Sequence, residues 1–185
     1  KDNDNQKDNE KITDVNINYK DNTVIEGNTK YIIAPHEIDK NSERINKYLG
    51  DKSILFSKIS SNTNLKELSC LIIDNIGMLS SLYSYSTVAY VGGGMGTKGL
   101  HNTLEPAYFS KPIIIGKNYK GFDEAEKMIK NGNMISISNF SDFTNVLESI
   151  IDNENLIKKM SNKCTKFFDK NKGGVKLILN NIKWN

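Results

Sequence analysis

Six short apolar runs, each followed by a polar or glycine-rich turn and then by residues of helical spacing, constrain the fold of this 185-residue chain. Consecutive apolar residues are typical of parallel strands that are covered by helices on both faces. The alternation therefore predicts an α/β protein with a Rossmann-like, open, doubly wound parallel sheet. The expected strands span residues 31–34, 53–56, 71–74, 87–91, 112–115 and 134–137.

Stretches of helical period lie between and after these runs. The last long stretch is expected to break near Asn153, and a further amphipathic segment, residues 175–184, follows two glycines. The expected helices span residues 37–49, 78–85, 104–109, 122–131 and 140–170.

Composition separates the first 29 residues from the rest of the chain. They are rich in Asn, Asp and Lys and poor in large apolar groups, so we expect a flexible leader or interdomain segment. Residues 30–185 are expected to form one Rossmann-like domain with carboxy-terminal helices. Because the chain starts at Lys1 without an initiator methionine, we also expect it to be part of something longer.

Charge and hydropathy exclude several classes of protein. The formal net charge is +3 with the lysines spread along the chain, so we expect no nucleic-acid partner. Cys70 lies in an apolar run and Cys164 in a lysine-rich helical stretch, a placement that favours two unpaired thiols in a reducing compartment. No apolar run approaches the roughly 20 residues of a membrane-spanning helix.

The segment from Gly92 to Gly99 has five glycines in eight positions, directly after an expected strand and shortly before an expected helix. Glycine lets backbone amides approach an anion closely, and a helix start adds free N–H groups. The string has no Gly-Lys-Ser/Thr ending and is no dinucleotide fingerprint, because the helix is delayed. By itself it is compatible with a phosphate site or with a simple tight turn.

The residues after these glycines strengthen the phosphate interpretation. Asn102 or Thr103 can cap the following helix, and Glu105 falls in its first turn, where the helix dipole favours a carboxylate. Glu105 can accept two hydrogen bonds from a ribose diol. Alternatively, it serves only as the capping-box partner of Asn102.

Two other strand ends carry polar turns. Pro35 follows the first strand, where it suits the start of a helix, and His36 would then point toward a ligand crevice or simply lie at the surface. The loop around Gly77 offers backbone N–H and C=O groups to a base edge. Ligands of open α/β sheets bind at the carboxyl ends of strands, where all of these residues lie.

These motifs together resemble the carboxy-terminal domain of the 3-deoxy-D-manno-octulosonic acid (Kdo) transferases. That family has a strand followed by Pro-Arg/His, a loop of the type Asp-Thr-Met-Gly-Glu-Leu, and Gly-Gly…Gly-His-Asn-x-Leu-Glu-Pro-Ala followed by Gly-Lys-Pro-Val. The counterparts here begin at Ala34, Asp74, Gly92 and Ser110, in the same order. The resemblance covers roughly residues 30 to 150 and is far more specific than a lone glycine motif.

The resemblance implies the carboxy-terminal half of a GT-B glycosyltransferase, which holds CMP-Kdo as donor for transfer to a lipid A precursor. The implied nucleotide-binding residues are Pro35, His36, Ile76, Gly77, Met78, Gly93, Gly94, His101, Asn102, Thr103, Leu104 and Glu105.

It further implies that the general base is a glutamate of an amino-terminal domain outside this sequence. We therefore expect no catalytic residue here and no sugar transfer by this chain alone. The implied partners are that amino-terminal domain, the lipid A precursor through the full-length enzyme, and a membrane surface touched peripherally at the cytoplasmic face of the bacterial inner membrane. No metal or other cofactor is expected, because no Asp-x-Asp string follows these strands.

Two departures from the family pattern affect expected roles. His36 and Glu37 stand where the family has an arginine-containing motif, so Lys98 or Lys117 is expected to neutralise the donor phosphate. Met78 replaces the usual glutamate, which leaves a backbone contact possible. The competing interpretations are a GT-B-type UDP-sugar transferase or epimerase domain and a non-catalytic nucleotide-binding module.

Overall fold

The computed structural model describes residues 29–96, 99–173 and 179–182, which form two compact units divided between Leu82 and Tyr83. The leader expected over residues 1–29 lies outside this part of the chain except for Thr29. Most of the amphipathic segment expected over 175–184 lies outside it too, although residues 179–181 are helical.

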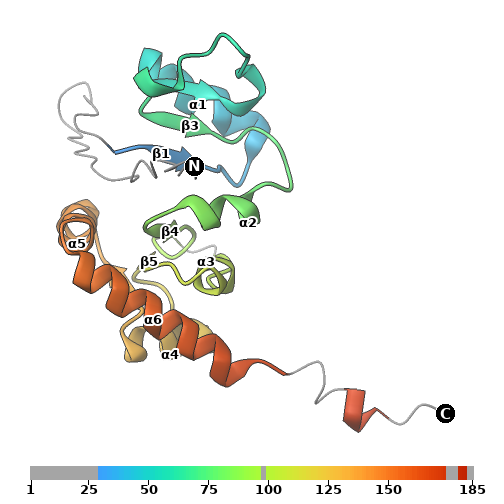
Figure 1. The fold of residues 1–185 in the computed structure, drawn as a ribbon, viewed down its shortest axis with the longest axis vertical. Coiled ribbons are helices and arrows are strands. Elements are labelled where there is room, and N and C mark those ends of the chain that lie inside the picture. Colours follow the sequence, from blue (N-terminus) through green and yellow to red (C-terminus); the bar gives the residue numbers. More distant parts are fainter. Residues whose placement is uncertain (1–28, 97–98, 174–178, 183–185) are drawn as a thin grey trace, which may run out of the picture. The chain divides into compact units, whose positions relative to one another are not determined.

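The first unit contains a parallel three-stranded sheet in the order β1-β3-β2. Its strands are β1 (Tyr31–Ile33), β2 (Ser53–Leu55) and β3 (Cys70–Ile72), and Cys70 is in register with both Tyr31 and Ser53. Helix α1 (Ile38–Leu49) packs against β2 and β3 (Figure 1). Three short 3₁₀ turns, Gly50–Lys52, Phe56–Lys58 and Leu65–Glu67, and helix α2 (Leu79–Leu82) complete the unit.

Alternating side chains of these strands form the core of the first unit. Leu55, Cys70 and Ile72 are buried, and Ile45 and Leu49 of α1 pack on them. Burial raises the pKa of the Cys70 thiol to about 12, so Cys70 behaves as a small apolar core residue.

The second unit contains a parallel sheet in the order β4-β5-β6. It comprises a 3₁₀ turn (Tyr83–Tyr85), β4 (Ala89–Val91), α3 (Leu104–Tyr108), β5 (Ile113–Gly116), α4 (Asp123–Asn131), β6 (Met134–Ile137), α5 (Phe140–Ile151) and α6 (Glu154–Asn171). All residues of β5, the central strand, are buried.

Helices cover both faces of this sheet (Figure 1). Ile113 and Ile115 face a cluster that includes Met128 of α4, whereas Ile114 faces a cluster that includes Leu147 and Ile150 of α5. Helix α6 contributes one buried side chain to each cluster. A strand buried on both faces has no polar alternation, which explains its continuous apolar run.

The expected α/β fold with parallel strands is confirmed, and the main differences concern pairing and boundaries. Hydrogen bonds divide the strands into two sheets instead of the one expected. Proline does not start the first helix as expected: α1 begins at Ile38, and Pro35 and His36 lie in the preceding loop. The expected break near Asn153 is confirmed, because its side chain accepts a hydrogen bond from the N–H of Leu156 (2.9 Å) and starts α6.

None of the helices in the described part of the chain combines the length and the apolar character that crossing a bilayer requires.

Candidate nucleotide-binding loops

In the first unit, the loops after β1 and β3 leave the same end of the sheet. The N–H of Ile73 donates to the carbonyl oxygen of Ile33 (2.8 Å), which holds the two strand ends together. Pro35 and His36 follow β1, and His36 is exposed. The structure thus places the first two sequence motifs at one edge, as the parallel arrangement requires.

The loop after β3 is open to solvent. Ile76 is 91% exposed, an unusual state for an isoleucine, and Gly77 has a φ of +96°, with open space where a Cβ would lie. The Asn75 amide donates to the sulfur of Met78 (3.0 Å). This tip offers an apolar surface and accessible backbone groups, which is what a stacking base with a polar edge requires.

Asp74 anchors the base of that loop. One carboxylate oxygen accepts a hydrogen bond from the N–H of Ser57 (2.9 Å), and the other accepts one from the Ser57 hydroxyl. These bonds, the hydroxyl bond first among them, lower the pKa of the Asp74 carboxyl. Asp74 therefore joins the loop after β3 to the loop after β2.

In the second unit, the glycine loop, defined as Gly92–Gly96 with Gly99–His101, folds back on itself after β4. The N–H of His101 donates to the carbonyl oxygen of Gly92 (3.1 Å). Gly93 has a φ of +90°, and a Cβ there would collide with the carbonyl oxygen of Gly99 and touch the His101 ring. Gly93 and His101, both predicted site residues, are therefore in contact. Lys98 lies outside the described residues.

The last residue of β5, Gly116, and the loop after it, residues 117–122, pack against the glycine loop. A Cβ on Gly116 would collide with the backbone of Gly94 and Met95, so glycine is required at this contact. Asn118 donates its N–H to the carbonyl oxygen of Gly94 (2.8 Å) and its side-chain amide to that of Gly96 (2.9 Å).

Polar side chains form hydrogen bonds with one another and with the backbone at the start of α3. The Asn102 carbonyl oxygen accepts a hydrogen bond from the N–H of Leu104 (3.0 Å), and its amide donates to Oε1 of Glu105 (2.9 Å). This is the Asn102–Glu105 pairing of the capping interpretation, although Glu105 bonds the side chain of Asn102 instead of its N–H. Thr103 is buried, and Leu104 is 39% exposed.

Two further residues beside these motifs were not predicted. Tyr83 is partly buried, and its pKa is raised first by burial and secondly by the negative charge of Glu105. Asn118 contacts the glycine loop directly. Asn118 follows a strand end, which is the signal that could have identified it, whereas nothing in the sequence pairs Tyr83 with Glu105.

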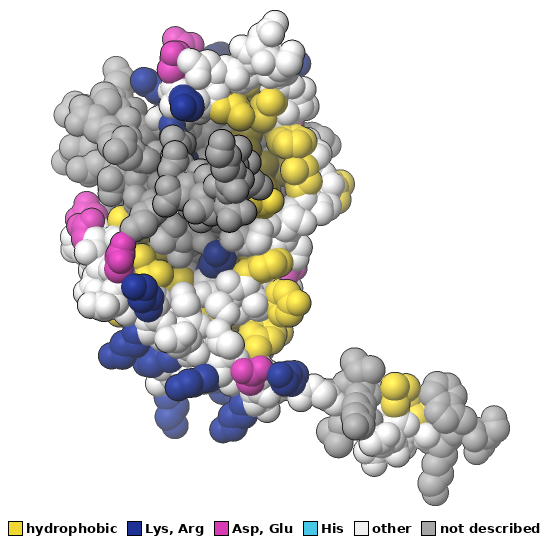
Figure 2. Space-filling model, viewed as in Figure 1, with side chains coloured by type: hydrophobic (Ala, Val, Ile, Leu, Met, Phe, Trp, Pro, Cys, Tyr) yellow, Lys and Arg dark blue, Asp and Glu magenta, His cyan; other side chains and the backbone are white. Residues whose placement is uncertain are grey.

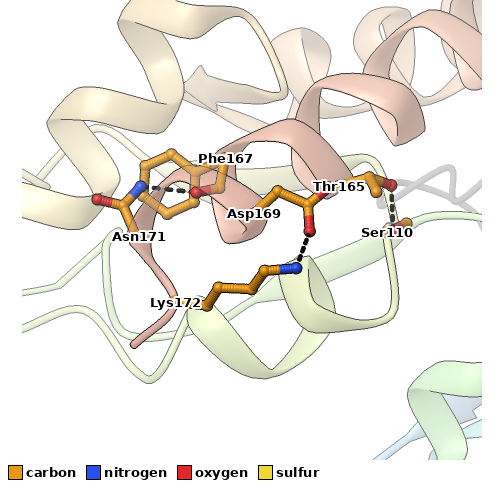
Figure 3. A network of polar contacts seen from close by, with 6 residues as sticks. All are labelled: Ser110, Thr165, Phe167, Asp169, Asn171 and Lys172. Atoms are coloured by element: carbon orange, nitrogen blue, oxygen red, sulfur yellow. Dashed lines mark hydrogen bonds and ion pairs between the residues drawn. The ribbon is translucent and has the colours of Figure 1, made fainter. Parts of the chain in front are cut away.

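The Ser110-Lys111-Pro112 turn, counterpart of the family's Gly-Lys-Pro, fastens α3 and β5 to α6. Ser110 has a φ of +57°, in the region that favours glycine, and its hydroxyl hydrogen-bonds that of Thr165 (2.8 Å; Figure 3). The Cys164 thiol donates to the carbonyl oxygen of Lys111 (3.2 Å). The turn therefore links α3 and β5 to α6.

Polar side chains also close the end of α6 (Figure 3). Asn171 donates to the carbonyl oxygen of Phe167 (2.6 Å), and Lys172 pairs with Asp169 (2.7 Å).

Nowhere in the described ranges do three His, Cys, Asp or Glu side chains gather in a way that could hold a metal ion.

Several curated proteins are similar in sequence to this chain. A bifunctional glycosyltransferase/methyltransferase of Fusobacterium nucleatum is 31% identical over 162 residues, 82% of this chain and 25% of that protein. The Kdo transferase of Rickettsia typhi is 33% identical over 133 residues, 69% of this chain and 28% of the enzyme. That of Haemophilus influenzae is 26% identical over 79% of this chain and 36% of the enzyme. The chain thus spans about a quarter to a third of the length of these relatives.

No family model matches the chain. Among solved structures, the C-terminal CMP-Kdo binding domain of WaaA from Acinetobacter baumannii superposes with a TM-score of 0.67 at 19% identity, covering 75% of this chain and 73% of that domain. The match supports the predicted fold. Over more than two thirds of its length the chain is therefore similar to Kdo transferases, as its motifs indicate, and it has the fold of their carboxy-terminal domain.

Proposed function

We propose that this chain is the donor-binding domain of a Kdo transferase and that it holds CMP-Kdo. The observation that carries the proposal is the His-Asn-x-Leu-Glu-Pro string from His101 to Pro106, placed after a folded-back glycine loop in a chain similar to these enzymes. Its function is to bind the nucleotide and to stabilise it as the leaving group.

Each loop has a separate role in this proposal. Glu105 has one carboxylate oxygen bonded to Asn102, which orients it, and the other oxygen accepts hydrogen bonds from the ribose diol. Backbone amides of the glycine loop stabilise the negative charge that grows on the departing CMP phosphate. Lys117 is exposed in the neighbouring loop and adds a positive charge toward that phosphate.

The chemistry needs a second domain. An acceptor hydroxyl attacks the anomeric carbon of Kdo while CMP leaves, so a general base is required on the acceptor side. We assign that base to an amino-terminal domain, as the family resemblance implies, and we expect this chain alone not to transfer sugar. We also propose that the reaction needs no metal, and that the acceptor is a lipid A precursor.

A peripheral contact with the cytoplasmic face of the inner membrane is part of the proposal. Helix α6 carries five lysines against two acidic residues, a net +3 that equals the formal charge of the whole chain. Four of these lysines, 159, 163, 166 and 170, recur at helical spacing on one side of α6. Figure 2 shows Lys side chains gathered over the α4 and α6 side of the second unit, which contains no arginine. Such a surface is attracted to anionic lipids.

Calorimetric titration of the chain with CMP, CTP, UMP and UDP tests the proposal. We expect selective binding of CMP. Glu105→Ala should weaken it by about tenfold or more, because a hydrogen bond to a charged group contributes about 1.5–3 kcal/mol. Glu148→Ala is the matched control, since Glu148 is an exposed glutamate on α5.

The alternatives predict different titrations. A preference for UMP or UDP would favour a UDP-sugar enzyme. No binding of any of the four nucleotides would favour a module in which the glycine loop is purely structural, and equal loss in both glutamate variants would remove Glu105 from the site.

A further inference from the structure

Asn118 is the only residue in the described part of the loop after β5 that bonds the glycine loop with both its backbone and its side chain. Its N–H donates to the carbonyl oxygen of Gly94 (2.8 Å), and its amide Nδ2 donates to that of Gly96 (2.9 Å). One residue thus fixes two carbonyl groups that lie two positions apart.

These bonds determine which way the loop's peptide groups point. A peptide group is planar and trans, so a carbonyl directed at Asn118 directs the N–H of the following residue to the opposite side. With the Gly94 carbonyl held by Asn118, the N–H of Met95 points away from Asn118. Met95 is 39% exposed, so the segment that carries this amide lies at the surface of the second unit.

Without these hydrogen bonds, the peptide groups of a glycine-rich loop would not keep one orientation. Glycine adopts positive and negative φ about equally well, so peptide groups between glycines rotate at low cost. A rotated peptide would present its carbonyl oxygen to an approaching anion and repel it. A donor that binds the two carbonyls on one side removes that alternative.

Asn118 is itself held in place. The N–H of Gly121 donates to Oε1 of Glu126 in α4 (2.8 Å), and the N–H of Phe122 donates to the carbonyl oxygen of Tyr119 (3.2 Å). The Phe122 ring also lies 3.4 Å from the position of a Cβ on Gly99. The loop that carries Asn118 is therefore tied to α4 on one side and packed under the glycine loop on the other.

We propose that Asn118 is a positioning residue, which keeps the carbonyls of the glycine loop turned inward so that its amides face the phosphate of the bound nucleotide. This inference rests on the proposed function, and it adds a residue that does not touch the nucleotide. It predicts that loop order and nucleotide affinity change together when the Asn118 side chain changes.

The test uses Asn118→Asp, which keeps the shape and the backbone bond but places an oxygen against the Gly96 carbonyl. We expect hydrogen exchange in ligand-free protein to become several-fold faster at residues 94–96 and 100–101, and CMP to bind at least tenfold more weakly. Asn139→Ala is the control. Asn139 caps α5 through the N–H of Asp142 (2.9 Å), so its loss lowers stability without touching the glycine loop.

Three outcomes overturn the inference: unchanged exchange in the loop, CMP affinity equal to that of the unchanged chain, or an affinity loss that Asn139→Ala reproduces. If the unchanged chain binds no CMP, the proposed function fails and the nucleotide role of Asn118 fails with it. The exchange measurement then still decides separately whether Asn118 holds the loop.

Discussion

Gly116→Ala is expected to destabilise the second unit, because it places a methyl group between two backbones. The new Cβ would collide with the carbonyl group of Gly94 and the nitrogen of Met95. Neither group can move by side-chain rotation, so the two loops must separate. Gly116 has no positive φ, so alanine itself suits the backbone and the collision alone decides the sign.

The magnitude follows from the contacts that separation would break. Inserting a methyl group into a packed site costs about 1–3 kcal/mol. The two hydrogen bonds of Asn118 to the glycine loop would also weaken, and each contributes about 0.5–1.5 kcal/mol. The lower entropy of the unfolded alanine chain offsets about 0.4–1 kcal/mol. With the middle of each range, and with the two hydrogen bonds about half lost, the net loss is about 2–3 kcal/mol, or roughly 4–12 °C in Tm for a chain of this size.

Thermal unfolding followed by circular dichroism measures this loss, with Gly96→Ala as the control. Gly96 lies in the same loop without a positive φ, and no described atom lies within 4 Å of an added Cβ. We expect the control to unfold at or slightly above the temperature of the unchanged chain. A Gly116→Ala chain as stable as the control would refute the close packing of the two loops.

Two further predictions concern the polar contacts of the loops. Hydrogen bonds from Ser57 hold the pKa of Asp74 below its unfolded value of about 3.9, so their stabilisation is present above that pH and is lost as pH falls through the folded-state pKa. Ser57→Ala should therefore lower Tm at pH 7 and have a smaller effect near pH 2, and a pH-independent gap between the melting curves would contradict this. In a Thr165→Val background, where the Ser110 hydroxyl has already lost its partner, Ser110→Gly should raise the free energy of unfolding in urea by about 0.5–1 kcal/mol by relieving the positive φ. A decrease would show that the turn is not strained.

Local patterns in the sequence were sufficient for most secondary-structure elements. The run from Ile113 to Ile115 indicates a strand buried on both faces, and the structure buries all three residues. Asn153 marks the break between α5 and α6, because its side chain satisfies an N–H at the start of the second helix. Where the prediction was wrong, at Pro35, the proline suits a loop as well as a helix start, and tertiary contacts determine which one forms.

The residues of the candidate site likewise include some that the sequence indicated and some that it did not. The sequence indicated the glycine loop and Glu105, because close backbone approach and a carboxylate in a first helical turn each have a local signature. It did not indicate Asn118, whose side-chain hydrogen bond to Gly96 joins segments about 20 residues apart, or the influence of Glu105 on the pKa of Tyr83. No periodicity records which polar side chain of one loop reaches the carbonyls of another.

By itself, the sequence therefore determined the parallel α/β class, the order of elements along the chain and the family that the chain resembles, since these depend on short-range patterns of apolar, polar and glycine residues. Only the tertiary structure decided that β3 lies between β1 and β2, that Gly116 contacts Gly94, and that Asn118 holds the glycine loop. Strand neighbours and loop contacts depend on how distant segments pack, and that packing is specified by the free energy of the whole fold instead of by any one stretch of residues.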